Sequence, residues 1–281
     1  FGVMEAQLGA APAVAAEYLQ LARRLEGMPS GEFAAATQRL RELIQQLEAP
    51  DAIALEVARK FAQDSRLVVR SSANCEDVEG LAGAGLYDSV MNVAPADVAS
   101  AIRTVWSSLW TRRAALSRQE AGIPHEQAHL AVLIQEMVFP DFSFVLHTVN
   151  PINHRVQEVY AEIVVGLGET LASAASRGTP YRLVCDKNSG TATTLAFANF
   201  SQTLQPNPGA GLRRQTVDYS RVDLSRDASA RQRLGRRLAA IGRFVEEALQ
   251  RPQDIEGVVA GDSIWLVQAR PQPGLPPGEE L

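Results

Sequence analysis

Two pairs of polar residues with matching spacing lie close to the C-terminus. Asp254 and Glu256 stand two positions apart, and Gln268 and Arg270 repeat that spacing after a turn at Gly261-Asp262. On adjacent strands of a hairpin, Glu256 and Gln268 can lie side by side, with Arg270 near Asp254. Carboxylate and amide oxygens suit Mg²⁺, which shares its ligands with substrate phosphates, and a guanidinium matches phosphate oxygens. The pattern indicates a Mg·triphosphate site. The alternative is a surface cross-strand salt bridge.

A second set of residues suited to phosphate binding lies earlier in the chain. Arg70 ends the β-branched run 66–70 and precedes a loop that contains Gly80, Gly83 and Gly85. Glycine lets backbone N–H groups approach phosphate oxygens without obstruction by a Cβ atom. A fixed positive charge at Arg70 could hold an oxyanion beside such a loop. The alternative is an ordinary flexible loop.

Other sequence motifs that carry known chemistry are incomplete. The segment Gly166–Leu171 follows a strand, as a dinucleotide fingerprint would, but Leu171 replaces the third glycine, and the chain contains no P-loop sequence. The histidines at 125 and 129 lie beside Pro124 between a helix and a strand, so a metal pair there is disfavoured. No G-x-S-x-G elbow supports a serine hydrolase. Cys75 and Cys185 form neither a C-x-x-C pair nor a disulfide framework.

The bulk composition is that of a globular domain. The 281 residues are 46% hydrophobic and 21% charged, with a formal net charge of −5, which allows one large domain or two lobes around a cleft. A cluster of arginines at 213, 214, 231, 233, 236 and 237 is interpreted as a solvated helix face. The sequence contains no apolar run long enough for a membrane span and no targeting segment. Because the chain opens on Phe1, we expect an excised part of a longer protein.

The elements that must position the two polar sets are predicted from periodicity. Alanine, leucine and glutamate favour helix from about 9 to 63, broken at Pro29-Ser30-Gly31. An apolar stripe that includes Trp106 and Trp110 predicts one helix over 97–119, with both tryptophans in the core. A second amphipathic helix is predicted over 231–249. Strands are predicted at 66–70, 86–93, 130–137, 142–149, 158–165, 181–185, 191–197, 255–259 and 264–268. The Pro- and Gly-rich stretch 205–215 is predicted to be a flexible connection.

These elements predict an α+β fold of antiparallel hairpins rather than alternating βαβ units. We expect a helical N-terminal segment at 1–65 and a lobe region with the glycine-rich loop at 66–204. A closing helix and the hairpin with the C-terminal polar residues follow at 216–271, and 272–281 is expected to be a disordered tail.

Several long motifs resemble those of a known family. The run Arg70–Val90, RSSANCEDVEGLAGAGLYDSV, is similar to the ATP-binding signature of the pyruvate phosphate dikinase and phosphoenolpyruvate synthase family. QDIEG at 253–257 and QARP at 268–271 resemble the metal- and phosphate-binding end of that family. Within it, WSSLWTRRAALSR, SFVLHTVNPI, VGLGETLAS, RGTPYRLVCDKNSG and LAFANFS look most like the C-terminal domain of plant and algal α-glucan, water dikinases. Phosphoglucan, water dikinase is the nearest competitor.

The resemblance implies an ATP-grasp fold, with mainly antiparallel strands in two lobes around a nucleotide cleft. It implies that Glu256 and Gln268 bind the metal-bound phosphates, with Asp254 close by, and that the catalytic arginines are Arg70 and Arg270. The implied ATP-binding residues are Arg70, Gly80, Gly83, Gly85, Arg113, Gln135, Glu162 and Arg270, with Glu162 and Gly166–Glu169 the weaker assignments. The implied cofactor is Mg²⁺, and ATP is the substrate.

The chemistry implied by the resemblance is a double transfer. ATP gives its β-phosphate to a histidine on a separate domain of the same parent protein and its γ-phosphate to water, and the phosphohistidine then phosphorylates α-glucan (starch). The implied location is the plastid stroma, with neither nucleic acid nor membrane as a partner. Phosphoenolpyruvate synthase-type or antibiotic phosphotransferase activity is an alternative, as is a truncated module that only binds nucleotide.

The chain departs from the family pattern in several places. No histidine lies in the glycine/threonine-rich context of the family's phosphorylated histidine, and the starch-binding modules are absent from the sequence. Lys60 and Lys187, the lysines of this sequence, do not fit the family's nucleotide-binding lysine segment, and Ala174, Ala175 and Ser176 replace a Ser-Gly-Thr run. We therefore expect that this chain alone cannot phosphorylate starch.

Overall fold

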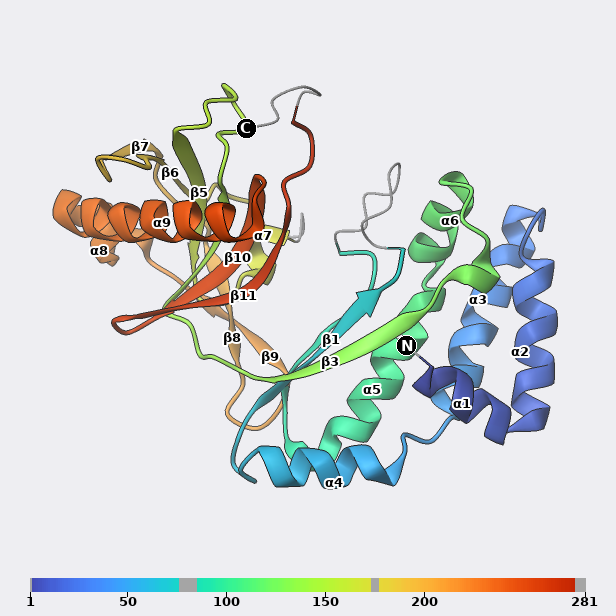
Figure 1. The fold of residues 1–281 in the computed structure, drawn as a ribbon. Helices are drawn as coiled ribbons and strands as arrows, with labels where there is room; N and C mark the ends of the chain where they lie inside the picture. The colour runs from blue at the N-terminus through green and yellow to red at the C-terminus, as the bar shows by residue number, and fades with distance from the viewer. Residues whose placement is uncertain (1, 76–84, 173–176, 276–281) are drawn as a thin grey trace. The chain divides into compact units, whose positions relative to one another are not determined.

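The computed structural model describes residues 2–75, 85–172 and 177–275 (Figure 1). The chain divides into two compact units. The first comprises Phe1–Met137 with Pro206–Leu212, and the second comprises Val138–Gln205 with Arg213–Leu281. Within the described residues, no helix is both long enough and apolar enough to cross a membrane.

Four helices form the N-terminal part of the first unit, where the sequence predicts helix with one break. They are α1 (Val3–Ala10), α2 (Pro12–Arg24), α3 (Ser30–Gln45) and α4 (Asp51–Lys60). Proline occupies the first position of α2, where its missing N–H has no intrahelical partner to lose. Leu40, Leu43 and Ile44 of α3 are fully or almost fully buried in the core of this unit. The helical prediction is confirmed, with more breaks than the sequence indicates.

A three-stranded antiparallel sheet in order β2-β1-β3 completes the first unit. Its strands are β1 (Leu67–Ala73), β2 (Val90–Val93) and β3 (Leu130–Glu136). Leu67 and Val69 point to one face, are completely buried and belong to the core that α5 (Val98–Ser107) joins. Because side chains alternate along a strand, Val68 and Arg70 lie on the other face.

The single helix predicted over 97–119 is wrong. The chain instead forms a short 3₁₀ turn at Pro95–Asp97, α5, a second 3₁₀ turn at Ser108–Trp110, and α6 (Arg112–Glu120). Thr111 causes the last break, because its backbone is extended and its hydroxyl accepts the N–H of Ala114 at 3.2 Å as the N-cap of α6. The core assignment of Trp106 and Trp110 is confirmed, since both are about 98–99% buried (2% and 1% exposed).

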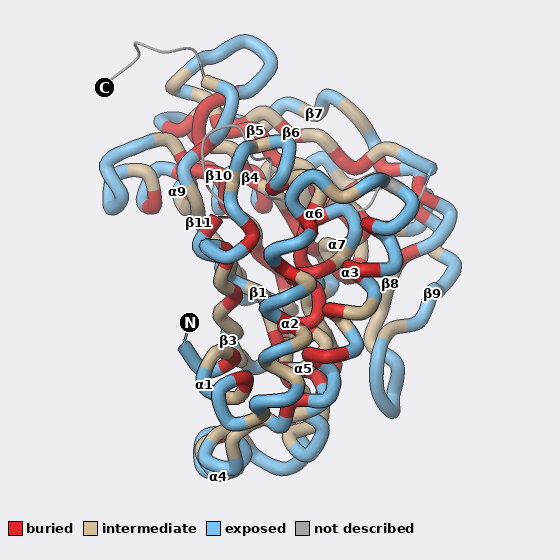
Figure 2. The backbone as a smooth tube through the Cα atoms, turned by 90° about the vertical axis from the view of Figure 1, so that its right-hand side faces the viewer, coloured by how far each residue is buried: buried red, intermediate tan, exposed pale blue. Residues whose placement is uncertain are grey.

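The second unit is built on a six-stranded sheet in order β11-β10-β4-β5-β6-β7, with every neighbouring pair antiparallel. Its strands are β4 (Phe142–His147), β5 (Glu158–Val165), β6 (Tyr181–Asp186), β7 (Ala192–Ala196), β10 (Gln253–Ala260) and β11 (Ser263–Pro271). The predicted antiparallel hairpins are therefore present. Buried and half-buried residues alternate along β6, as a strand with one covered face requires (Figure 2).

The long helix α9 (Ala228–Leu249) covers one face of this sheet (Figure 1). It packs closely because glycine stands where a larger residue would collide. A Cβ atom on Gly242 would lie 2.8 Å from Val159 Cγ1, and one on Gly235 would lie 2.5 Å from the Cβ of Ala192. Shorter helices, α7 (Glu169–Ala172) and α8 (Asp223–Arg226), complete the unit. Val159 therefore marks the face under α9, and Tyr160 and Glu162, one and three residues on, point away from it.

The flexible connection predicted over 205–215 is wrong. Its ends belong to strands β8 (Gln202–Pro206) and β9 (Leu212–Thr216), which form a two-stranded sheet. The N–H of Asn207 donates to Gly211 O at 3.0 Å across the turn. Asn92, almost fully buried, donates its side-chain amide to the carbonyls of Asn207 and Gly211 at 2.7 and 2.8 Å. The Pro- and Gly-rich composition suits the turn between β8 and β9, but neither the two strands nor this distant anchor is visible in the local sequence.

Candidate functional site

The face of the six-stranded sheet opposite α9 carries two adjacent rows of mainly polar side chains. Because register partners in an antiparallel sheet share a face, each row is read directly from the pairing. The first row runs Arg270, Asp254, His147, Tyr160 across β11, β10, β4 and β5. The second row runs Gln268, Glu256, Val145, Glu162, Arg182 across β11, β10, β4, β5 and β6. The structure thus brings five predicted site residues, at 162, 254, 256, 268 and 270, to one surface.

Asp254 and Arg270 form an ion pair at the edge of this surface. The Asp254 side chain is only 7% exposed, and its Oδ2 accepts from Arg270 Nε at 3.0 Å and from Nη2 at 2.8 Å. The predicted hairpin neighbours are therefore in contact. Asp254 fixes the guanidinium, while its other oxygen, Oδ1, is buried without a hydrogen-bond partner in the described structure.

Glu162 is held by two neighbours that the sequence did not single out. Its Oε1 accepts from the Tyr160 hydroxyl at 3.0 Å and from Arg182 Nε at 2.9 Å. Burial raises the pKa of Tyr160 to about 12, and the nearby Glu162 charge adds to that rise. The phenol therefore stays a hydrogen-bond donor at neutral pH. Because alternate residues of a strand share a face, the position of Glu162 would have indicated Tyr160 as its neighbour. That Arg182 also lies beside Glu162 can be predicted only if the register between β5 and β6 is known.

His147 is a further residue that sequence analysis missed. Its Nε2 lies 3.7 Å from Asp254 Oδ1, and its Nδ1 is buried without a hydrogen-bond partner among the described residues. Burial lowers the pKa of His147, although the charge of Asp254 opposes that shift. Its ring is tilted by 38° against Tyr160, at a centroid distance of 6.3 Å. The neutral imidazole thus lies between the two polar pairs.

The oxygen atoms of this face fit a divalent cation that shares its ligands with a substrate. No group of three or more His, Cys, Asp or Glu residues in the described parts of the chain is arranged to hold a metal by itself. Mg²⁺, however, binds proteins through one or two carboxylates and takes its remaining ligands from water and phosphates. The carboxylates of Asp254 and Glu256 and the amide of Gln268 supply such oxygens.

The remaining predicted site residues lie in the first unit. Gln135 is the register partner of Val68, two residues before Arg70, so Gln135 and Arg70 share the face of the sheet opposite Leu67 and Val69. Arg113 is exposed in the first turn of α6. Gly85 has a positive φ of 68°, which favours glycine. Gly80 and Gly83 lie outside the described residues.

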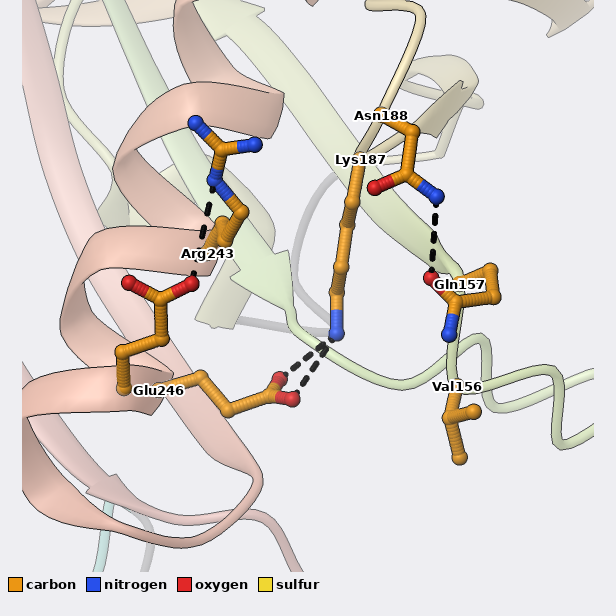
Figure 3. Close-up of a pocket in the computed structure, with 7 residues that line it drawn as sticks. Val156, Gln157, Lys187, Asn188, Arg243 and Glu246 are labelled. Atoms are coloured by element: carbon orange, nitrogen blue, oxygen red, sulfur yellow. Dashed lines mark hydrogen bonds and ion pairs between the residues drawn. The ribbon is translucent and has the colours of Figure 1, made fainter.

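A surface pocket of about 200 Å³ lies apart from these residues, beside the C-terminal half of α9 (Figure 3). Lys187 donates to both carboxylate oxygens of Glu246 at 2.8 and 2.9 Å, and Gln157 and Arg243 contribute to the lining. The Lys187 side chain is 6% exposed. Its ammonium group is thus committed to an internal ion pair.

Comparison with known proteins identifies the family. Residues 13–279 match the family described as pyruvate phosphate dikinase, AMP/ATP-binding domain. The chain is 37% identical to alpha-glucan water dikinase 2 of Arabidopsis thaliana over 198 residues, which are 61% of this chain and 16% of that protein. It is 30% identical to rifampicin phosphotransferase of Bacillus subtilis over 239 residues (84% of this chain, 27% of that protein).

A third relative is the chloroplastic alpha-glucan water dikinase of Solanum tuberosum, 35% identical over 199 residues that cover 61% of this chain and 14% of that protein. The matches thus span between 14% and 27% of the length of these relatives. The family match itself covers almost the whole chain, including both polar sets. The chain therefore belongs to the pyruvate phosphate dikinase AMP/ATP-binding domain family.

Proposed function

We propose that this chain is the ATP-binding, phosphoryl-donating domain of an α-glucan, water dikinase, with an ATP-grasp fold. The observation that carries the proposal is the paired register of the β10–β11 hairpin, which places Asp254 beside Arg270 and Glu256 beside Gln268 on one face. A metal-bound triphosphate requires carboxylate and amide oxygens for the cation and a guanidinium for the phosphate oxygens. The identity with two alpha-glucan water dikinases supports the choice of parent enzyme.

In this proposal the residues of the second unit act on the phosphates. Glu256, Gln268 and Asp254 hold Mg²⁺, which when bound neutralises phosphate charge. Arg270 contacts the phosphoryl oxygens, because its guanidinium is already oriented by Asp254. Glu162, fixed by Tyr160 and Arg182, is a further nucleotide contact.

The first unit supplies the second group of ligands in the proposal. Arg70 and Arg113 contact phosphates, and Gln135 contacts the nucleotide from the same sheet face as Arg70. The glycines at 80, 83 and 85 form the phosphate loop. The positive charges of the arginines offset the negative charge on the phosphoryl oxygens, so that positioning and charge neutralisation carry the catalysis.

The proposed reaction consumes ATP, water and a histidine side chain. The γ-phosphate passes to water and the β-phosphate to the histidine, which leaves AMP, inorganic phosphate and phosphohistidine. We place that histidine on a separate domain of the same parent protein, which then phosphorylates α-glucan. The chloroplastic relative from Solanum tuberosum supports a plastid location.

The first test is calorimetric titration of this chain with ATP, in the presence and absence of Mg²⁺. We expect Glu256→Gln to weaken binding with Mg²⁺ about tenfold or more, because it removes a charged oxygen ligand, and to leave Mg-free binding nearly unchanged. Arg270→Ala is expected to weaken both. Glu247→Gln, an exposed charge on α9, is the matched control. Equal losses by Glu256→Gln with and without Mg²⁺ would contradict the metal role.

A second candidate acceptor is a small molecule rather than glucan. The observation in its favour is that the rifampicin phosphotransferase matches 84% of this chain, against 61% for the water dikinases. Supplying a phosphohistidine domain together with ATP labelled in the β-phosphate, and offering starch or rifampicin in parallel, separates the two. Label in starch supports the water dikinase, and label in rifampicin overturns it.

A further inference from the structure

A series of neighbouring side chains, linked by hydrogen bonds, an ion pair and a ring contact, crosses five strands on the sheet face opposite α9. Arg270 donates to Asp254, whose second oxygen faces His147 at 3.7 Å. The His147 ring lies against Tyr160. The Tyr160 hydroxyl and Arg182 both donate to Glu162, as described above. His147 on β4 is thus the central side chain of this series, and none of the roles proposed above uses it.

One carboxylate oxygen of Asp254 lacks a hydrogen-bond donor among the described residues. Arg270 Nε and Nη2 both donate to Oδ2, whereas Oδ1 is buried and accepts no hydrogen bond in the described structure. A buried carboxylate oxygen without a donor is costly. The ring nitrogen Nε2 of His147 lies 3.7 Å from this oxygen. The other ring nitrogen of His147, Nδ1, is buried and has no hydrogen-bond partner among the described residues, so no competing hydrogen bond from them holds the ring.

We propose that His147 is a positioning residue, whose Nε2–H donates to Asp254 Oδ1 and fixes the carboxylate that orients Arg270. This inference rests on the proposed function insofar as Arg270 contacts ATP. For this hydrogen bond, the separation of 3.7 Å between Nε2 and Oδ1 must shorten to about 3 Å. His147 then sets the direction of the Arg270 guanidinium without touching the nucleotide.

Two polar substitutions distinguish this role from simple filling of space. Glutamine at 147 places its amide nitrogen near the position of Nε2, whereas asparagine reaches only as far as Nδ1. We expect His147→Asn to lower the affinity for Mg·ATP about tenfold, the loss typical of one hydrogen bond to a charged group. The affinity of His147→Gln for Mg·ATP is expected to stay within about threefold of that of the unaltered chain, because the glutamine amide can keep the hydrogen bond to Asp254. His154→Asn, an exposed histidine of the same unit, is the control.

The Nε–H resonance of Arg270 in the nucleotide-free chain gives a readout that does not depend on ATP binding. We expect slow solvent exchange at this group in the unaltered chain and in His147→Gln. We expect fast exchange in His147→Asn and in Asp254→Asn. In the Asp254→Asn background, His147→Asn should cause no further loss of Mg·ATP affinity, because His147 acts through Asp254.

The outcomes separate this inference from the proposed function. A chain that binds no Mg·ATP but shows the expected exchange pattern at Arg270 overturns the function and supports the positioning role. Normal Mg·ATP binding with equal affinity and exchange in His147→Asn and His147→Gln overturns the positioning role alone. Additive losses in the double variant also overturn it.

Discussion

The internal ion pair between Lys187 and Glu246 gives a quantitative test of how α9 is fixed to its sheet. Lys187 follows β6, Glu246 lies in the last turns of α9, and their side chains are 6% and 12% exposed (Figure 3). Lys187→Met removes the ammonium group but keeps most of the apolar stem. It leaves the Glu246 carboxylate buried beside an uncharged side chain.

The expected cost follows from that burial. Breaking a buried ion pair on one side costs about 3–5 kcal/mol, because the remaining charge stays desolvated without compensation. The ion pair between Arg243 and Glu247 lies on the same helix with side chains 50% and 69% exposed and a separation of 3.9 Å. Loss of such an exposed pair costs about 0.5 kcal/mol. Replacing both buried partners, as Lys187→Met with Glu246→Leu, removes the unpaired charge and should recover most of the loss.

The assay is native-state hydrogen exchange in urea, read from peptides that cover 228–249. A local readout is preferable because a chain with two units need not unfold in one step. Lys187→Met should lower the free energy of opening of α9 several-fold more than Arg243→Met does. If the two substitutions cost the same, or if the double replacement of the buried pair is as unstable as Lys187→Met, the reasoning from burial is refuted.

Three further predictions concern pH and packing. Burial raises the pKa of Tyr18 from 10.0 to about 12. The unfolded chain therefore loses this proton first, and the stability of the fold should decrease as the pH rises from 10 to 12. In thermal melts over this range, Tyr18→Phe should show a smaller decrease in stability. Burial lowers the pKa of His125 from 6.5 to about 4, so stability should fall as pH drops through that window, and His125→Asn should flatten the slope. Gly242→Ala should destabilise by about 1–3 kcal/mol through collision with Val159, whereas Gly9→Ala, which meets nothing within 4 Å, should be neutral or stabilising in urea titrations.

The hairpin at the C-terminal end of the site could be predicted because its information is local. Gly261-Asp262 predicts the turn and the hairpin itself, but a regular register from that turn would pair Glu256 with Val267 rather than with Gln268. The register shift between Glu256 and Gly257 supplies the one-residue offset that places Glu256 opposite Gln268 and Asp254 opposite Arg270. The proposed roles of these residues remain predictions.

The rest of the polar face could not be predicted, since it depends on pairing between distant segments. His147 reaches Asp254 because β4 pairs with β10, more than a hundred residues later. Arg182 reaches Glu162 only through the register of β5 with β6. A shift of one residue in either pairing would turn these side chains to the α9 face. No sequence feature near His147 indicates the register of β4 with β10.

Gly257, the last residue of QDIEG, connects the packing of the core to the position of Glu256. A Cβ atom there would lie 2.2 Å from Phe144 Cζ and 2.8 Å from the carbonyl oxygen of Trp265. Phe144 is 2% exposed and cannot retreat into solvent. We therefore expect Gly257→Ala to displace β10 beside Glu256 and to weaken Mg·ATP binding by calorimetry at least as much as it lowers stability. Phe144→Leu shortens the ring and should restore part of both losses in the double variant. Full binding by Gly257→Ala would show that this glycine does not fix the position of Glu256.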